Sequence, residues 1–282
     1  MSSPTARPVC LSIAGSDPSG GAGIQADLKT FSALGVYGAA ALAGLTVQNT
    51  QGVRDARGVD PAFVVAQVAA VVDDLPVAAT KIGMLSDATT ASAVAGLIRE
   101  RRDAFGVIVL DPVMVATSGD RLLAEDAVEA IRADLLPLAD LVTPNLPEAG
   151  VLLGVAEAED VDGLREQALA LIRAGTRAVL AKGGHLRGDA LLDVFADAAG
   201  VADLTGERIA TRNTHGTGCT LSSAIAACAA RRGDTRETGV SRAAIEDARR
   251  YLADAIAAGA GWRLSRTPES GHGPVDHLVT LG

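Results

Sequence analysis

Apolar residues along this chain fall into two alternating patterns, short continuous runs and longer alanine-rich segments. VCLSIAG at 9–15 has the length and composition of a buried strand, and GIQADLKTFSALG at 23–35 has the length of a helix. Further strands are expected within 38–48, 79–84, 106–113, 139–145 and 177–184, and further helices at 61–75, 216–231 and 239–260. Regular strand–helix alternation predicts an α/β fold with a doubly wound, mostly parallel central sheet and helices on both faces.

Two runs late in the chain interrupt this alternation. DALLDVFAD (189–197) and GERIAT (206–211) are expected to form a pair of edge strands before the helix that begins near residue 216. The sequence contains no low-complexity linker and no internal repeat, so we predict a single domain over residues 1–282. Residues 1–8 and 263–282 are the expected flexible ends.

Composition narrows the classes of function. The 282 residues are 48% hydrophobic and 21% charged, which supports a large core. A net charge of -9 and only 2% aromatic residues argue against nucleic acid as a partner. The apolar runs are too short for a membrane span, and MSSPTARPVC lacks the apolar stretch of a signal peptide.

The three cysteines do not form a disulfide framework. Cys219 and Cys228 are nine residues apart on one expected helix, so they lie on opposite faces of it and cannot pair. We therefore expect a reducing, cytoplasmic location.

Polar residues stand where the expected strands end. In a doubly wound sheet, ligands bind outside the carboxyl ends of the strands. Any one polar loop residue is more often structural than functional, but six such ends with complementary chemistry indicate a site. The residues at these ends are Asp17, Gln48 with Asn49, Lys81, Asp111, Asn145 with Glu148, and Lys182.

The glycine-rich loop GSDPSGGAGIQAD (15–27) follows the first strand. It contains Gly21-x-Gly23-x-x-Ala26, which formally matches a dinucleotide fingerprint. The acid that binds the ribose should follow about 20 residues later, yet residues 41–50 contain none. We therefore interpret the segment as a substrate loop and reject a dinucleotide-dependent oxidoreductase. The alternative is a turn capped by Asp17.

Three of the strand-end residues have chemistry suited to phosphate. Carboxylates such as Asp111 and Glu148 suit Mg²⁺ held largely through water and substrate phosphates. Lys182, beside two glycines, is a candidate cation for a phosphate tail. The alternatives are a helix-dipole role for Glu148 and a plain turn role for Lys182.

The motif NTHGTGCTLSSA (213–224) opens an alanine-rich helix. Its backbone N–H groups would form an anion hole for a transferring phosphoryl group. The helix dipole would also lower the pKa of a cysteine placed there, which suits a proton acceptor. The alternative for that cysteine is a small buried hydrophobe. The residues of this turn are Gly216, Thr217, Gly218 and Cys219.

Taken together, these motifs resemble the hydroxymethylpyrimidine/phosphomethylpyrimidine kinases of thiamine biosynthesis. The motifs, in chain order, are IAGSDPSGGAGIQADLKTFSALGVYG, QNTQGV, TKIGML, DPVM…SGD, TPNLPEA, KGGHL and NTHGTGCTLSSAIA. The resemblance implies a ribokinase-like fold and a homodimer. It also implies that MgATP phosphorylates 4-amino-5-hydroxymethyl-2-methylpyrimidine (HMP), and then HMP phosphate to the diphosphate.

The resemblance also implies a role for each matching residue. Cys219 would be the proton acceptor, where the wider ribokinase superfamily usually has an aspartate. Asp111 and Glu148 would serve Mg²⁺. Gly15, Asp27 and Gln48 would line the pyrimidine site, with Met84 and Val113 as apolar walls, and Lys182, Asn145 and Thr217 would bind the ATP phosphates.

Physical chemistry supports the assignment of Gln48. A 4-aminopyrimidine presents a donor beside a ring-nitrogen acceptor, and a carboxamide offers the complementary pair. Pyridoxine cannot make this pair equally well, but a vitamin B6 kinase is still an alternative because cysteine-containing relatives use pyridoxal. A non-catalytic pyrimidine-binding protein is a second alternative, against which the retained phosphate machinery argues.

Overall fold

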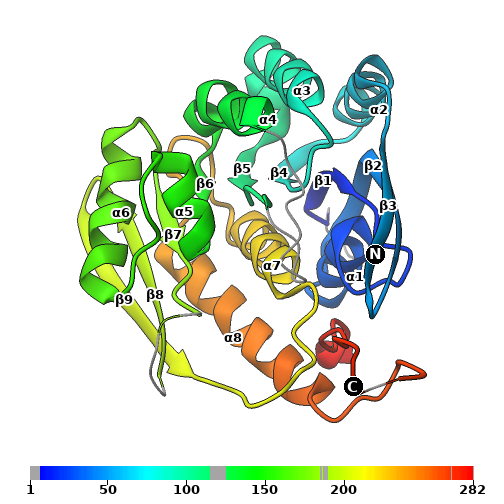
Figure 1. Ribbon diagram of the computed structural model, residues 1–282. Coiled ribbons are helices and arrows are strands. Elements are labelled where there is room, and N and C mark those ends of the chain that lie inside the picture. The colour runs from blue at the N-terminus through cyan, green and yellow to red at the C-terminus, as the bar shows by residue number, and fades with distance from the viewer. Residues whose placement is uncertain (1–6, 115–124, 185, 187–189, 268, 282) are drawn as a thin grey trace, which may run out of the picture.

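A computed structural model describes residues 7–114, 125–184, 186, 190–267 and 269–281 (Figure 1). Within these residues one continuous sheet has the strand order β3-β2-β1-β4-β5-β6-β7-β8-β9. The pairs from β2 to β7 are parallel, whereas β3, β8 and β9 join antiparallel at the two edges. The expected doubly wound, mostly parallel α/β sheet is confirmed. The strands are β1 Val9–Gly15, β2 Tyr37–Asn49, β3 Gly52–Gly58, β4 Val77–Ile82, β5 Val107–Leu110, β6 Leu141–Val142, β7 Val179–Ala181, β8 Ala190–Asp197 and β9 Gly200–Glu207.

Two edge features differ from the sequence prediction. The expected pair of edge strands is present as β8 and β9, but the bounds 206–211 for the second strand are wrong, because β9 ends at Glu207. β8 turns back into β9 within two residues, and Gly200 has the left-handed φ of 136° at the start of the return strand. β3 was not predicted, because its sequence GVRDARG is polar and its side chains are mostly exposed.

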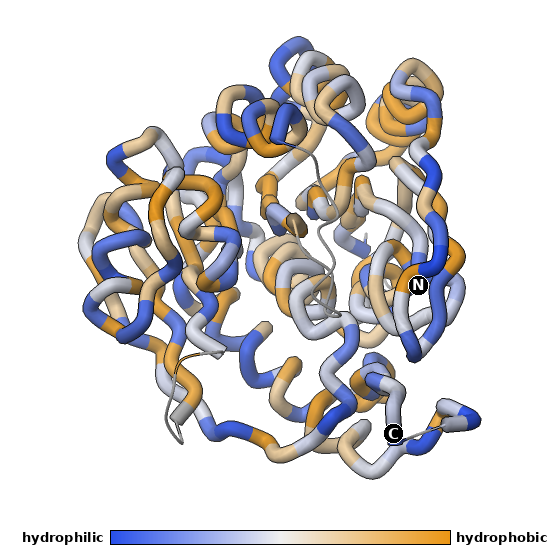
Figure 2. The backbone as a smooth tube through the Cα atoms, in the orientation of Figure 1, coloured by the Kyte–Doolittle hydropathy of each residue, from blue (hydrophilic) through white to orange (hydrophobic). Residues whose placement is uncertain are grey.

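The helices form a layer on each face of the sheet. Val64 of α2 and Val94 of α3 belong to the apolar core on one face, and Phe31 of α1 and Ile225 of α7 belong to the core on the other. Figure 1 shows α7 across the centre of the sheet, and in Figure 2 hydrophobic residues recur along the central strands and the helices beside them. The α-helices are α1 Gly23–Ala33, α2 Pro61–Asp74, α3 Ala88–Glu100, α4 Glu125–Ala130, α5 Leu146–Leu153, α6 Val161–Arg173, α7 Thr217–Arg232 and α8 Arg242–Gly259; shorter helical turns are η1 Arg102–Phe105, η2 Ile131–Leu135, η3 Leu136–Leu138 and η4 Val279–Leu281.

A close approach between two loops fixes the start of α7. Gly216, the N-cap, has φ 80°, and a Cβ at this position would lie 1.8 Å from the carbonyl oxygen of Gly21. Only glycine can therefore hold the helix start against the glycine-rich loop after β1. This contact places the N-terminus of α7 beside the carboxyl ends of the central strands.

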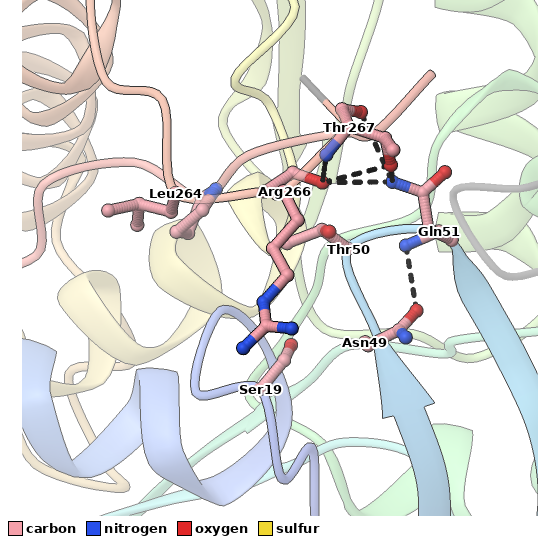
Figure 3. Close-up of a pocket in the computed structure, with 9 residues that line it drawn as sticks. Ser19, Asn49, Thr50, Gln51, Leu264, Arg266 and Thr267 are labelled. Atoms are coloured by element: carbon pink, nitrogen blue, oxygen red, sulfur yellow. Dashed lines mark hydrogen bonds between the residues drawn. The ribbon is translucent and has the colours of Figure 1, made fainter. Parts of the chain in front are cut away.

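The C-terminal segment, expected to be a flexible end, contacts the rest of the protein through a few residues, although most of its described residues are exposed. Val275 is fully buried, and Tyr251 of α8 donates a 2.6 Å hydrogen bond to the carbonyl of His277. Figure 3 shows that Gln51, on the turn between β2 and β3, reaches Thr267, with 3.0 Å between Gln51 Nε2 and Thr267 Oγ1. The burial of Val275 and His277, which the sequence did not predict, holds this segment.

None of the helices in the described part of the chain combines the length and apolarity that a membrane crossing requires.

Candidate active site

A cavity of about 910 Å³ lies at the carboxyl ends of the central strands. Its wall includes residues of β2, the loops after β1, β4, β5, β6 and β7, and the start of α7. All the residues to which the resemblance or the anion-hole motif assigned a role, except Asp27, line it: Gly15, Gln48, Met84, Asp111, Val113, Asn145, Glu148, Lys182, Gly216, Thr217, Gly218 and Cys219. The strand-end residue Asn49, expected beside Gln48, does not line this cavity. The expected gathering of the strand ends therefore holds except at Asn49.

The exception is Asp27, which was expected to line the pyrimidine site. Its side chain is fully buried beneath the cavity, and Lys81 Nζ lies 2.9 and 2.8 Å from its two carboxylate oxygens. Ser12 and Ser223 donate 2.6 Å hydrogen bonds to the same two oxygens. With both oxygens occupied in this way, Asp27 holds Lys81 in place and does not face a substrate.

Lys81, expected from the sequence only as one of the strand-end residues, also lines the cavity. Its ammonium group is buried, which opposes the charged form, but the nearby carboxylate of Asp27 more than compensates and raises the pKa of Lys81. The register of the sheet explains the pairing, because Lys81 of β4 lies beside Ser12 of β1 on the face that α1 and α7 cover. A buried Lys81–Asp27 ion pair therefore lies beneath the start of α7.

Lys182 and two carboxylates form the second charged cluster. Lys182 Nζ lies 3.1 Å from Asp111 Oδ1 and 3.9 Å from Glu148 Oε2. Burial and the charge of Asp111 raise the pKa of Glu148 against the opposing effect of Lys182. Burial opposes the charged form of Lys182, but Asp111 and Glu148 prevail and raise its pKa. The cluster presents a cation and two acids to the same part of the cavity.

Glu148 also has a local structural role. Its Oε2 accepts a 2.8 Å hydrogen bond from the N–H of Asn145, while Asn145 Oδ1 accepts a 2.9 Å bond from the N–H of Glu148. This reciprocal capping box starts α5. The helix-start role considered from the sequence is therefore real, and it fixes the Glu148 carboxylate beside Lys182.

The donor set fits a magnesium ion that is bound partly through a substrate. Among the residues that the structure describes, no three histidine, cysteine or acidic side chains group closely enough to hold a metal alone. Two carboxylates, Asp111 and Glu148, do meet at the cavity wall, and Mg²⁺ commonly uses one or two carboxylates together with water and substrate phosphates. The SGD part of the expected motif, at 118–120, lies outside the described residues.

The start of α7 offers a smaller anion hole than predicted. The first intrahelical hydrogen bond runs from Thr220 N–H to Gly216 O, so the N–H groups of Gly218 and Cys219 precede the ladder and extend from the helix end. Thr217 N–H instead donates back to Thr214 O at 3.3 Å. Of the predicted anion-hole donors, the N–H groups of Gly218 and Cys219 are therefore directed out of the helix end, whereas that of Thr217 is already paired.

The predicted low pKa of Cys219 is wrong for this site. Burial raises the pKa of the thiol to about 11, and the charges of Asp27 and Asp111 add to the effect. Lys81 and the Gly23 N–H lower the pKa, but they do not overcome burial. The thiol is therefore protonated at neutral pH before ligands bind.

His215 and Asp17 form a cavity-lining pair that the sequence did not reveal. His215 Nε2 lies 2.7 Å from Asp17 Oδ2, and both residues are buried. Asp17 also caps its own loop, which was the alternative given for the glycine-rich segment, since it accepts hydrogen bonds from Ser19, Gly21 and Ala22. Burial opposes ionisation of Asp17, yet the hydrogen bonds from His215 and Ser19 lower its pKa to about 2. The only feature of the sequence that could have indicated this pair is the position of His215 directly before Gly216.

An anion hole, a lysine and two carboxylates around one cavity define this chain as a phosphotransferase of the α/β class. Residues 17–276 match the family described as phosphomethylpyrimidine kinase, and the chain belongs to that family. It is 51% identical to the hydroxymethylpyrimidine/phosphomethylpyrimidine kinase of Rhizobium meliloti (strain 1021), over 96% of this chain and 97% of that protein. The resemblance inferred from the motifs is thereby confirmed.

Two solved structures have the same fold. A pyridoxal kinase from Bacillus subtilis in complex with ADP has a TM-score of 0.85 at 35% identity, over 97% of this chain and 98% of that one. A phosphomethylpyrimidine kinase from Clostridium difficile 630 has a TM-score of 0.76 at 36% identity, over 89% of this chain and 100% of that one. Pyrimidine and pyridoxal kinases thus share this architecture.

Proposed function

We propose that this chain uses ATP to phosphorylate HMP, and then HMP phosphate to the diphosphate, as a cytoplasmic enzyme of thiamine biosynthesis. The observation that carries the proposal is a single cavity that brings Gln48 together with the Asp111–Glu148–Lys182 cluster and the start of α7. The similarity to the R. meliloti kinase over nearly the whole of both chains supports it.

In the proposed site, the Gln48 amide pairs with the aminopyrimidine edge while Met84 and Val113 flank the ring. Gly15 leaves room for the Met84 side chain at the cavity wall, because a Cβ there would lie 2.4 Å from Met84 Cε. Lys182 and the N–H groups of Gly218 and Cys219 stabilise the charge on the transferring phosphoryl group. Asp111 and Glu148 would hold Mg²⁺, which would neutralise phosphate charge when bound.

One assay tests this function against its alternatives. ADP formation is measured with HMP, HMP phosphate and pyridoxal as separate acceptors, and the two pyrimidines should give the higher kcat/KM. A higher value with pyridoxal would favour a vitamin B6 kinase, a candidate that the likeness to the B. subtilis pyridoxal kinase supports. If none of the three acceptors supports ADP formation, the result would favour a non-catalytic pyrimidine-binding protein.

Replacing Gln48 by leucine should lower kcat/KM for HMP by about 10²-fold or more, because the aminopyrimidine loses its paired donor and acceptor. The value for pyridoxal should change less. The matched control is Gln51→Leu, on the turn outside the cavity. Steady-state kinetics with both substrates provide the measurement, and an unchanged value for HMP would remove Gln48 from the site.

Asp111→Asn and Glu148→Gln should each raise the Mg²⁺ concentration for half-maximal activity by about 10-fold, because each removes an anionic oxygen from the metal site. Titration with Mg²⁺ at fixed ATP measures the shift. The exposed acid Glu129 provides the control substitution Glu129→Gln. Identical half-saturation in all the proteins would mean that both carboxylates are structural.

We also propose a homodimer. The support is a group of exposed apolar side chains on β2, where Tyr37, Leu45 and Val47 are each at least half exposed. Such residues are typical of a surface that another chain covers. Light scattering after size exclusion would measure the mass of the assembly.

A further inference from the structure

The amide of Gln48 lies between two neighbours in the cavity wall. Its Oε1 lies 3.1 Å from Thr46 Oγ1, and its Nε2 lies 3.4 Å from His215 Nε2. A half-turn of the amide exchanges its oxygen and nitrogen without moving any other atom. The hydrogen atoms of the two neighbours decide which of the two orientations is stable.

The first neighbour, His215, is a donor at Nε2. Asp17 is ionised at neutral pH, and a carboxylate only accepts hydrogen bonds, so the 2.7 Å contact requires the proton on His215 Nε2. An Nε2–H group has no lone pair left for a second donor. The Gln48 carbonyl oxygen can accept this hydrogen together with Asp17. The NH₂ group of Gln48 cannot, because two N–H donors would then face each other.

The second neighbour, Thr46, is an acceptor toward Gln48. Its hydroxyl has one hydrogen, which it donates to the carbonyl oxygen of Ser16 at 2.9 Å. Only oxygen lone pairs then face Gln48, and they require the NH₂ group. Both neighbours therefore select the orientation that a half-turn of the amide produces from the one given above, so that the nitrogen faces Thr46 and the oxygen faces His215.

This orientation determines what the cavity can recognise. Gln48 uses one N–H group to contact Thr46 and one oxygen lone pair to contact His215. Its second N–H group and its second oxygen lone pair are left on the edge that faces the cavity. They match an amino group beside a ring nitrogen in one order only. A reversed amide would match the opposite order, which a 4-oxopyrimidine presents.

We propose that His215 and Thr46 are positioning residues that lock the Gln48 amide and thereby select the 4-amino form of the pyrimidine. Asp17 contributes by holding the proton on His215. The inference rests on the proposed role of Gln48 in substrate binding. Because the ring carbon that bears the hydroxymethyl group neighbours the amino-bearing carbon, the same lock also determines on which side of the amide the hydroxymethyl group lies.

The test compares HMP with its 4-oxo analogue, in which the exocyclic group accepts and the ring nitrogen donates. The wild-type protein should prefer HMP by a kcat/KM ratio of about 10² or more. His215→Phe and Thr46→Val should each lower this ratio by about 10-fold, the weight of one hydrogen bond, because the amide becomes free to turn.

Two control substitutions keep the lock intact. Thr46→Ser retains the hydroxyl, and His272→Phe replaces an exposed histidine in the C-terminal segment, so both should retain the wild-type ratio. Thermal unfolding of each variant identifies any that fail to fold. His215→Phe and Thr46→Val change opposite sides of the amide, so each tests the lock independently of the other.

Unequal changes for the two substrates are the signature of the lock. If His215→Phe and Thr46→Val lower kcat/KM for both substrates by the same factor, the ratio stays unchanged and the inference is overturned while the proposed function stands. If the wild-type protein does not phosphorylate HMP, the proposed function and this inference both fail.

Discussion

Replacing Lys81 by methionine should lower the free energy of unfolding by about 3–5 kcal/mol, because it leaves the Asp27 carboxylate buried without its countercharge. Both partners of this pair are fully buried, and Lys81 Nζ lies within 2.9 Å of each carboxylate oxygen. The hydrogen bonds from Ser12 and Ser223 remain, but they do not neutralise the charge. Denaturant-induced unfolding followed by circular dichroism measures the loss.

Two further variants sharpen this result. Lys29→Met, at an exposed lysine, should change the free energy of unfolding by less than about 1 kcal/mol. The double variant Lys81→Met with Asp27→Asn removes both charges and should recover part of the loss. If Lys81→Met unfolds at the wild-type denaturant concentration, the pair contributes little to stability.

The general position of the site could be predicted because a parallel sheet brings its strand ends together. Gln48, Asp111 and Lys182 are far apart in the sequence, yet each lies at or just after the end of a strand whose apolar run is evident. Their gathering around one cavity follows from strand order and direction alone. The edge strand β3 was missed because exposed polar residues carry no comparable pattern.

Side-chain environment could not be predicted in the same way. Asp27 lies on α1, and its direction depends on the register that sets Ser12 beside Lys81 and on the packing of α7 over both. The helix dipole at Cys219 is evident from the sequence, but the burial that outweighs it is a property of the folded chain. The Asp17–His215 contact joins residues 198 positions apart, and no local pattern indicates it.

The cysteine at the start of α7 should matter more for the first phosphorylation than for the second. HMP offers a hydroxyl, whose proton must leave as the oxygen attacks. HMP phosphate offers a phosphate whose second pKa is about 6, so its attacking oxygen is already ionised at neutral pH. The anion hole serves both steps, whereas a proton acceptor, which at Cys219 is the small thiolate fraction, serves only the first. We therefore expect Cys219→Ala to lower kcat/KM for HMP by about 10²-fold and to lower that for HMP phosphate much less.

The raised pKa of Cys219 adds a pH dependence to this prediction. The thiol is protonated at neutral pH, and its thiolate fraction grows about tenfold per pH unit below a pKa of about 11. The first step should therefore quicken as the pH rises in the wild-type protein but not in Cys219→Ala. Cys228→Ala, at a buried cysteine on the same helix, is the matched control and should leave both steps unchanged. Equal losses in the two steps of Cys219→Ala would show that the residue shapes the anion hole without accepting a proton, and no loss in either would make it a small buried hydrophobe.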